Sequence, residues 1–233
     1  MSTEQGVVEA WLHAAGLRDA DAPPSSVMAA VRDLIDALGD LDDEFDPDAL
    51  YRYPVPMLSE DGTCSIVEEL APTPYDLTGA LGGQSDAATR KLRLLNQLVE
   101  RAAAVTGTDW VGIYQRRTRF DGTEALIKLA YRGRPSRAEF PLTAEFVQGS
   151  TNSTVGLTGK AKLITDVEAY TRDGGGFYVC DTAVQSEACL PIFSADGKVA
   201  GILDAEAAPK FFFMPEKLAV FVAACVVAPA LLP

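Results

Sequence analysis

A cysteine beside an aspartate, Cys180-Asp181, stands four residues after a run of three glycines, Gly174–Gly176. Most free cysteines are small, buried apolar residues. The polar neighbours and the flexible glycine loop instead place Cys180 at an accessible mouth, where a thiol can take part in redox chemistry. No histidine or lysine stands nearby to favour the thiolate, and Arg172 is the nearest cation. We therefore predict a redox-active Cys180, with a buried structural cysteine as the alternative.

Three carboxylates follow on two expected strands. Glu187 begins one apolar run, and Asp204 and Glu206 end the next. Residues two apart on a strand project to the same face, so Asp204 and Glu206 lie together, and Glu187 joins them if the two strands pair. Crowded carboxylates need a cation or a shared proton. The cluster therefore suits a ligand ammonium group or a held proton, whereas solvated strand ends are the alternative.

Trp110 and Tyr114 lie four residues apart on another expected strand and share its face. They could line a pocket for a thioether or a cation. Ordinary core packing explains them equally well.

The elements that must position these residues are clearest after residue 85. Helical spacing predicts a helix over 86–106 and an almost wholly apolar one over 215–228. Period-two patterns and turn residues predict strands over 109–115, 125–131, 138–142, 188–193 and 198–205. We expect a polar loop at 149–154, a short helical turn at 156–161 and a flexible loop at 173–176. This order predicts an α+β fold, with an antiparallel sheet and the terminal helices packed on one face.

The front third has a different composition. Residues 1–85 contain 17 acidic and 3 basic residues, and so carry all of the net charge of −13. Helices are predicted over 4–17 and 25–38, a solvated acidic linker follows at 40–48, and the proline-containing stretch 51–81 reads as extended or irregular. We therefore divide the chain into an acidic N-terminal extension, residues 1–85, and a second domain, residues 86–233. The negative extension disfavours binding to nucleic acid or to an anionic membrane.

Other patterns exclude whole classes of function. The first residues do not resemble a signal peptide, and the longest apolar run is about half of what a membrane span needs. We expect a cytoplasmic protein with reduced thiols. Four cysteines without a CxxC pair and a single histidine argue against a structural zinc site and a histidine-based triad. No metal and no cofactor is predicted.

The ordered set of motifs resembles a GAF domain, specifically the free methionine-(R)-sulfoxide reductase branch, over residues 86–228. The matching segments are Asp109–Tyr114, Gly159–Ala161, Thr165–Val167, Gly176–Asp181, Ser186–Pro191 and Gly201–Glu206. The resemblance implies that Cys180 attacks the sulfoxide sulfur and becomes a sulfenic acid, which another thiol reduces. It assigns Cys180, Glu187 and Asp204 to catalysis. It assigns substrate binding to Trp110, Tyr114, Asp181 and Glu206.

The sequence also departs from that family. Arg137 and Thr158 stand where it commonly has two further cysteines, Phe177 stands where histidine is frequent, Glu206 replaces an aspartate, and an insertion lengthens the chain around 146–154. An external thiol, such as a thioredoxin-like protein, or Cys64 would then have to resolve the sulfenic acid. The competing hypothesis is a non-catalytic GAF sensor that binds a small amino-acid-like ligand. The apolar last helix needs a cover, which the helix at 25–38 or a second copy in a homodimer could supply.

Overall fold

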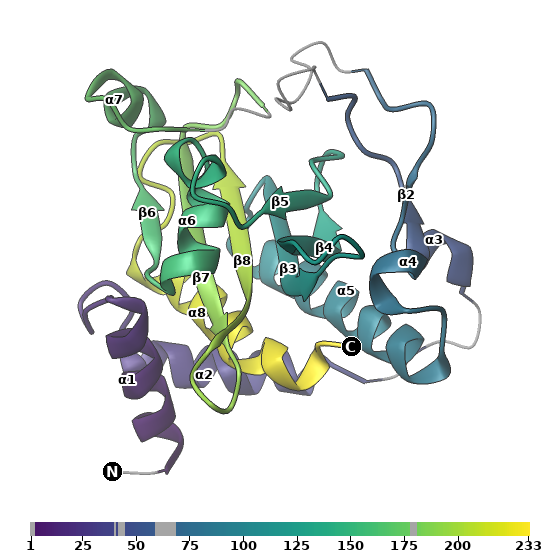
Figure 1. Ribbon diagram of the computed structural model, residues 1–233. Coiled ribbons are helices and arrows are strands. Elements are labelled where there is room, and N and C mark those ends of the chain that lie inside the picture. The colour runs from purple at the N-terminus through teal and green to yellow at the C-terminus, as the bar shows by residue number, and fades with distance from the viewer. Residues whose placement is uncertain (1–2, 40, 42–44, 59–68, 178–180) are drawn as a thin grey trace.

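The strands of the second domain form a curled, six-stranded antiparallel sheet. The computed structural model describes residues 3–39, 41, 45–58, 69–177 and 181–233. The strands follow the spatial order β5-β4-β3-β8-β7-β6. Their bounds are β3 Trp110–Thr118, β4 Glu124–Arg132, β5 Glu139–Pro141, β6 Lys162–Ile164, β7 Ser186–Phe193 and β8 Val199–Ala207. The predicted α+β fold with an antiparallel sheet is confirmed (Figure 1).

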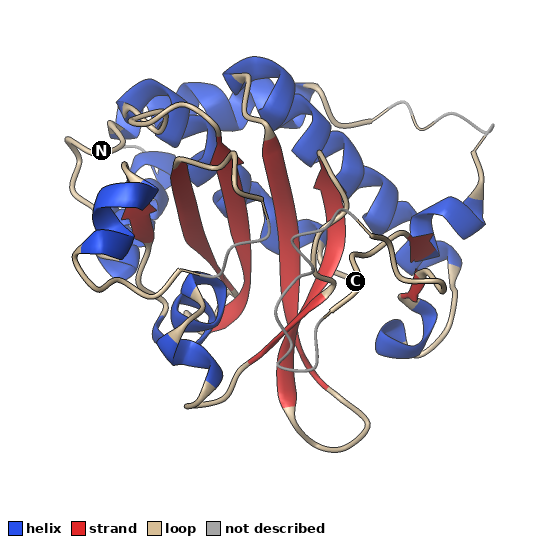
Figure 2. Ribbon diagram, turned by 90° about the horizontal axis from the view of Figure 1, so that it is seen from above, coloured by secondary structure: helices blue, strands red, loops and turns tan. Residues whose placement is uncertain are grey.

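Two long helices cover one face of this sheet, α5 (Asp86–Thr106) and α8 (Pro215–Val227), and the short η2 (Ala228–Leu231) follows α8. Helix α5 begins where Ser85 Oγ accepts a hydrogen bond from the Ala88 amide, and it ends at Gly107 in the left-handed conformation. Its apolar stripe is buried against the sheet, as its spacing predicts. Figure 2 shows the helices lined up along this side of the strands.

The front helices complete the same layer. Helices α1 (Thr3–Ala15) and α2 (Pro24–Asp36) match the predicted pair within a few residues. Helix α2 packs against α8 and buries Val27 and Leu34 in one continuous apolar cluster with the second domain. The cover that α8 requires is therefore supplied by the extension.

The stretch predicted as extended or irregular contains short elements: α3 Pro47–Tyr51, β1 Arg52–Tyr53, β2 Tyr75–Asp76 and α4 Thr78–Leu81. Two tyrosines attach it to the sheet edge. Tyr53 donates its hydroxyl to the backbone oxygen of Lys128 at 2.7 Å, and Tyr75 donates to Glu139 Oε1 at 2.6 Å. Prolines and long-range contacts, rather than local periodicity, set this path.

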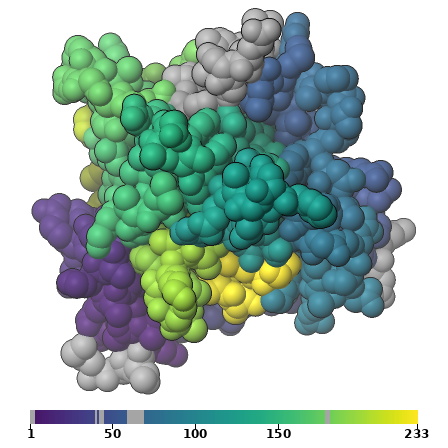
Figure 3. Space-filling view, viewed as in Figure 1, coloured from purple at the N-terminus to yellow at the C-terminus, as the bar shows by residue number. Residues whose placement is uncertain are grey.

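The opposite face of the sheet is covered by η1 (Phe146–Gln148) and α6 (Thr151–Thr158), while α7 (Val167–Arg172) lies near β6. The prediction of a polar loop at 149–154 was wrong. Ser150 Oγ caps the helix by accepting the Ser153 amide at 3.2 Å, and the helix ends at Gly159, which has a φ of 65°. The predicted helical turn at 156–161 is therefore the end of this helix, which stops at Thr158. In the space-filling view, the teal-to-green part of the chain, which includes η1 and α6, covers the middle of this face (Figure 3).

Within the described ranges, none of the helices combines the length and the apolar character that crossing a membrane demands.

Candidate functional site

The sheet face beneath α6 carries the predicted carboxylates and aromatic residues. Trp110 and Tyr114 come from β3, Glu187 from β7, and Asp204 and Glu206 from β8. The register places both Trp110 and Glu187 opposite Glu206. These five side chains line one small cavity, together with Ser136, Phe140, Ser150, Thr151 and Asn152. The geometry thus brings together five of the seven residues expected in the site.

Two of the three carboxylates are withdrawn from solvent. Glu187 is 2% exposed and Asp204 is 3% exposed, and Glu206 is half-buried. Strand ends facing solvent, the alternative for these residues, are therefore excluded for Glu187 and Asp204. A buried carboxylate needs a partner or a proton, so the cluster is a candidate binding site.

Cys180 lies outside the described residues. Asp181 is described, but it is not among the residues that line the cavity. Its carboxylate accepts the Ala183 amide at 2.8 Å and lies 3.7 Å from an Arg134 guanidinium nitrogen.

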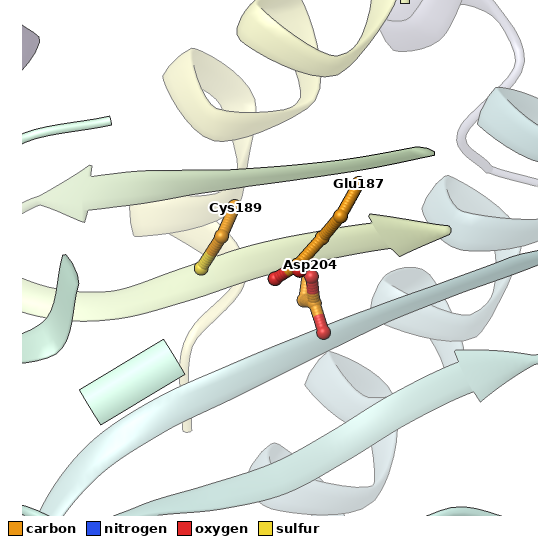
Figure 4. Close-up of side chains that lie close together, drawn as sticks. All are labelled: Glu187, Cys189 and Asp204. Carbon is orange, nitrogen blue, oxygen red and sulfur yellow. The ribbon is translucent and has the colours of Figure 1, made fainter. Parts of the chain in front are cut away.

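The buried carboxyl groups hold their protons more tightly than usual. Burial is the main cause that raises the pKa of Glu187 well above its ordinary value, and the charges of Asp204 and Glu206 add to it. Burial also raises the pKa of Asp204 to about 7, against opposing hydrogen bonds from Asn152 and from the neighbouring Glu187 carboxyl group. Figure 4 shows the two carboxyl groups next to each other, on neighbouring strands. The pair of acids therefore keeps a proton to a higher pH than isolated carboxyl groups do.

Each of these carboxyl groups has one bonded and one free oxygen. The Thr151 hydroxyl donates to Glu187 Oε1, and Asn152 Nδ2 donates to Asp204 Oδ2 at 3.1 Å. Glu187 Oε2 and Asp204 Oδ1 are buried and have no hydrogen-bond partner in the described part of the chain. Unpaired buried acceptors are costly, and an ammonium group or a shared proton would satisfy them.

A thiol that the sequence analysis did not place in the site lies beside these groups. Cys189 stands opposite Asp204 on β7, is fully buried, and donates its thiol hydrogen to Asn152 Oδ1 at 3.3 Å. Burial, followed by the charges of Asp204 and Glu187, raises its pKa well above the ordinary value. Because thiolates are the reactive form, we expect Cys189 to react more slowly than an ordinary exposed thiol.

Glu187, Cys189 and Asp204 could also be considered as metal ligands, since one ligand atom of each lies within 4.8 Å of the others. A thiolate and two carboxylates are acceptable to zinc. Binding would, however, have to remove the tightly held protons of Glu187 and Cys189. An ammonium group would use the two free oxygens without removing the thiol proton, and it therefore fits the cluster better.

The aromatic wall is fixed by hydrogen bonds at its polar tips. Trp110 Nε1 donates to the Arg134 backbone oxygen at 3.0 Å, and the Tyr114 hydroxyl donates to that of Arg137 at 3.1 Å. Gly112, between the two aromatic residues, leaves room for the indole, because a Cβ there would lie 2.4 Å from the Trp110 ring. The two residues therefore pack in the core and line the cavity at once.

Arg137 and Thr158, which stand where the resemblance leads one to expect cysteines, make other contacts. The Arg137 guanidinium carbon lies 4.8 Å from the centre of the Phe146 ring, so this side chain packs on η1. Thr158 is exposed at the end of α6, where its hydroxyl donates to the Thr154 backbone oxygen.

Sequence reasoning missed five of the cavity residues: Ser136, Phe140, Ser150, Thr151 and Asn152. Of these, Thr151 and Asn152 bond directly to the buried acids. They were assigned to a loop, because a Thr-Asn-Ser-Thr run is typical of turns and caps. A usable signal was present: Ser150 is a favourable N-cap, and Gly159, nine residues later, is a favourable end. These two residues bound a helix of the right length to cover the sheet.

Comparisons with known proteins agree with this fold. The family model for the GAF domain matches residues 91–228. A type II free methionine-R-sulfoxide reductase from Thermoplasma acidophilum aligns with a TM-score of 0.53 and 19% identity, over 63% of this chain and 94% of its own. A free methionine-R-sulfoxide reductase from Neisseria meningitidis, solved with its substrate, aligns with a TM-score of 0.48 and 21% identity, over 60% and 78%.

A putative GAF sensor protein from Burkholderia vietnamiensis aligns with a TM-score of 0.44 and 24% identity, over 63% of this chain and 90% of its own. A search of curated protein sequences gave no match. At these identities the structural likeness concerns the fold alone. The family-model match covers more than half of the sequence, and the chain therefore belongs to the GAF domain family.

Proposed function

We propose that this protein binds a free α-amino acid through its ammonium group and reduces free L-methionine-(R)-sulfoxide with a thiol. The observation that carries the proposal is the pair of free oxygens, Glu187 Oε2 and Asp204 Oδ1, buried in a cavity that Trp110 and Tyr114 also line. An ammonium group supplies the positive charge and the donors that these oxygens require. The aromatic faces suit the methyl-sulfur end of the same ligand.

The redox step is assigned to Cys180. Its thiolate attacks the sulfoxide sulfur while a carboxyl group of the cluster protonates the sulfoxide oxygen. A sulfur–sulfur bond forms between Cys180 and the substrate as the protonated oxygen leaves as water. A water molecule then attacks the Cys180 sulfur, the sulfur–sulfur bond breaks, methionine leaves as the thioether, and Cys180 becomes a sulfenic acid with release of a proton. An external dithiol, such as a thioredoxin-like protein, then forms a mixed disulfide with release of water, and its second thiol restores Cys180. Glu187 is the proton donor best suited to this step, because burial raises its pKa.

The ligand must open the site in order to enter it. The cavity has a volume of about 20 Å³, which is room for one water molecule and not for an amino acid. A cavity of this size is equally compatible with the second candidate function, a GAF sensor that binds an amino-acid-like ligand without turnover.

An epimer-resolved assay separates the two functions. The protein is incubated with racemic free methionine sulfoxide and dithiothreitol, and the epimers are followed by chiral chromatography. We expect loss of the R epimer only, no loss with Cys180→Ser, and unchanged loss with Cys225→Ser, since Cys225 is buried in α8. N-acetyl-methionine sulfoxide, which carries no ammonium group, should remain intact. Ligand binding without consumption of either epimer would contradict the reductase function and favour the sensor.

A further inference from the structure

The first residues of α6 place two neutral donors against the two buried carboxyl groups. The Thr151 hydroxyl donates a hydrogen bond to Glu187 on β7, and the Asn152 side-chain amide donates one to Asp204 on β8. Thr151 is 8% exposed and Asn152 is 5% exposed. Buried polar residues at the start of a helix normally cap that helix, but here Ser150 is the cap. The side chains of Thr151 and Asn152 are thus free of a capping role and can bond to carboxyl groups on the sheet.

Asn152 is itself held in one orientation. Its Oδ1 accepts from the Cys189 thiol at 3.3 Å, while its Nδ2 donates to Asp204 Oδ2 at 3.1 Å. A flipped amide would turn its oxygen toward the carboxylate, so the hydrogen bond to Asp204 would be lost, and its NH₂ group would meet only the weak sulfur acceptor of Cys189. Cys189 therefore fixes which end of the amide meets Asp204.

The two carboxyl groups also bond to each other, and this hydrogen bond raises the pKa of Glu187 and lowers that of Asp204. A proton shared between two acids this close occupies one oxygen of each group, so further donors decide which oxygens stay open to a ligand. With the donors present, Glu187 Oε1 and Asp204 Oδ2 are already bonded, and the second oxygen of each group is left without a partner among the described residues. The hydrogen bonds from α6 thereby select which oxygen of each group remains an acceptor.

We propose that Thr151 and Asn152, the latter through Cys189, are positioning residues that hold Glu187 and Asp204 with one oxygen of each directed at the ligand. The role in ligand binding rests on the proposed function, whereas the hold on the carboxyl groups does not. Both donors come from the part of the chain expected to be an inserted loop. The insertion accordingly supplies part of the site in addition to covering it.

The test measures the two carboxyl groups directly. ¹³C-labelled aspartate and glutamate report the side-chain carboxyl shifts of Asp204 and Glu187 by NMR as the pH is raised, in the full chain without ligand. Replacing Asn152 with leucine should raise the apparent pKa of Asp204, and Thr151→Val should raise that of Glu187, each by about one unit, because a donor to the ionised form is lost. Thr151→Ser keeps the donor and should restore the original titration.

Cys189 provides the matched pair for the amide. Cys189→Ser keeps a donor for Asn152 Oδ1, and Cys189→Ala removes it, so only the alanine variant should change the titration of Asp204. Cys225→Ala, a thiol-to-methyl change at another buried cysteine, is the control for general loosening. Unchanged pKa values in the Thr151→Val and Asn152→Leu variants, with both folded by circular dichroism, would overturn the proposal.

Calorimetry with L-methionine (R)-sulfoxide then separates this proposal from the proposed function. If the wild type binds it, Thr151→Val and Asn152→Leu should weaken binding about tenfold, while Thr151→Ser should not. Unaltered affinity in both variants would also overturn the positioning role. If the wild type does not bind it, the proposed function fails, and the carboxyl titrations alone still decide whether α6 holds these groups.

Discussion

Cys189 and Asp204 stand directly opposite each other on β7 and β8, on the cavity face of the sheet. One amide, that of Asn152, joins the thiol to the carboxyl group. A buried thiol beside two acids retains its proton, because both burial and the neighbouring negative charges raise its pKa.

We therefore predict that Cys189 reacts slowly in the folded protein. Brief exposure to mild peroxide or iodoacetamide at pH 7.5, followed by peptide mass spectrometry, should modify Cys180 while Cys189 stays unmodified. Cys225 is the internal control, since it is equally buried and its pKa is also raised. A sulfenic adduct found on Cys189 before Cys180 would show that Cys180 is not the redox-active thiol, and it would contradict the proposed mechanism.

The cavity acids should make stability depend on pH. The folded-state pKa of Asp204, about 7, lies above the unfolded value of 3.8. The folded protein therefore binds a proton that the unfolded chain releases, and the free energy of unfolding should fall as the pH rises through this window, by roughly 1 kcal/mol per pH unit. The titratable groups that face Asp204 from the packed strands are Tyr114, Glu187, Cys189 and Glu206.

Urea denaturation from pH 4 to pH 8 checks this effect. Asp204→Asn should flatten the decline, because the asparagine has no proton to lose. Asp196→Asn is a control of opposite character, since Asp196 is exposed and its pKa is lowered to about 2. A wild-type protein that becomes more stable from pH 5 to pH 8 would show that the acids are not buried as described.

Adding a single methyl group at Gly112 should destabilise the protein. A Cβ at this position would lie 2.4 Å from the Trp110 ring, so Gly112→Ala must push the indole from its place. We expect a loss of about 1–3 kcal/mol in the free energy of unfolding and weaker ligand binding. The changed Trp110 environment can be followed by fluorescence in a Trp11→Phe background.

Gly149→Ala is the matched control for Gly112→Ala. No atom lies within 4 Å of a Cβ built at Gly149, and its φ of −119° is open to alanine. Equal effects of the two substitutions on stability and fluorescence would refute the packing argument.

Two neighbouring residues of α2 test whether the extension is part of the structural core. Leu34 is 1% exposed within the shared apolar cluster, whereas Ile35 is 51% exposed. Leu34→Ala should lower the free energy of unfolding by about 2–5 kcal/mol, and Ile35→Ala should change it by much less. Denaturant unfolding followed by circular dichroism measures both, and similar losses would contradict the packing of α2 on α8.

The sequence predicts the sheet and its cavity face well, because short apolar runs bounded by turn residues mark the strands, although β3, β7 and β8 are buried on both faces. The two-residue spacing of Asp204 and Glu206 was sufficient to place them on one face, and the pairing of β7 with β8 added Glu187. Helix α5 was predicted with its observed bounds, because its apolar residues follow helical spacing and Gly107 stands just past its end.

The sequence could not reveal what depends on contacts far apart in the chain. Thr151 and Asn152 are polar because they meet buried carboxyl groups, so an apolar period never marks α6. The site contribution of Cys189 follows from its pairing with Asp204 and from the nearby amide, neither of which is local. Tyr53 and Tyr75 find their partners on β4 and β5 only after the extension has folded back.

The packing of α2 on α8 has a consequence for how the protein can be divided. The boundary near residue 85 marks a change in charge, but the apolar cluster crosses it without interruption. A fragment cut at that boundary would present the bare side of a nearly all-apolar helix to water, and it should associate with itself or precipitate. A fusion protein that contains residues 86–233 would therefore also need the acidic N-terminal extension, because α2 covers this apolar surface.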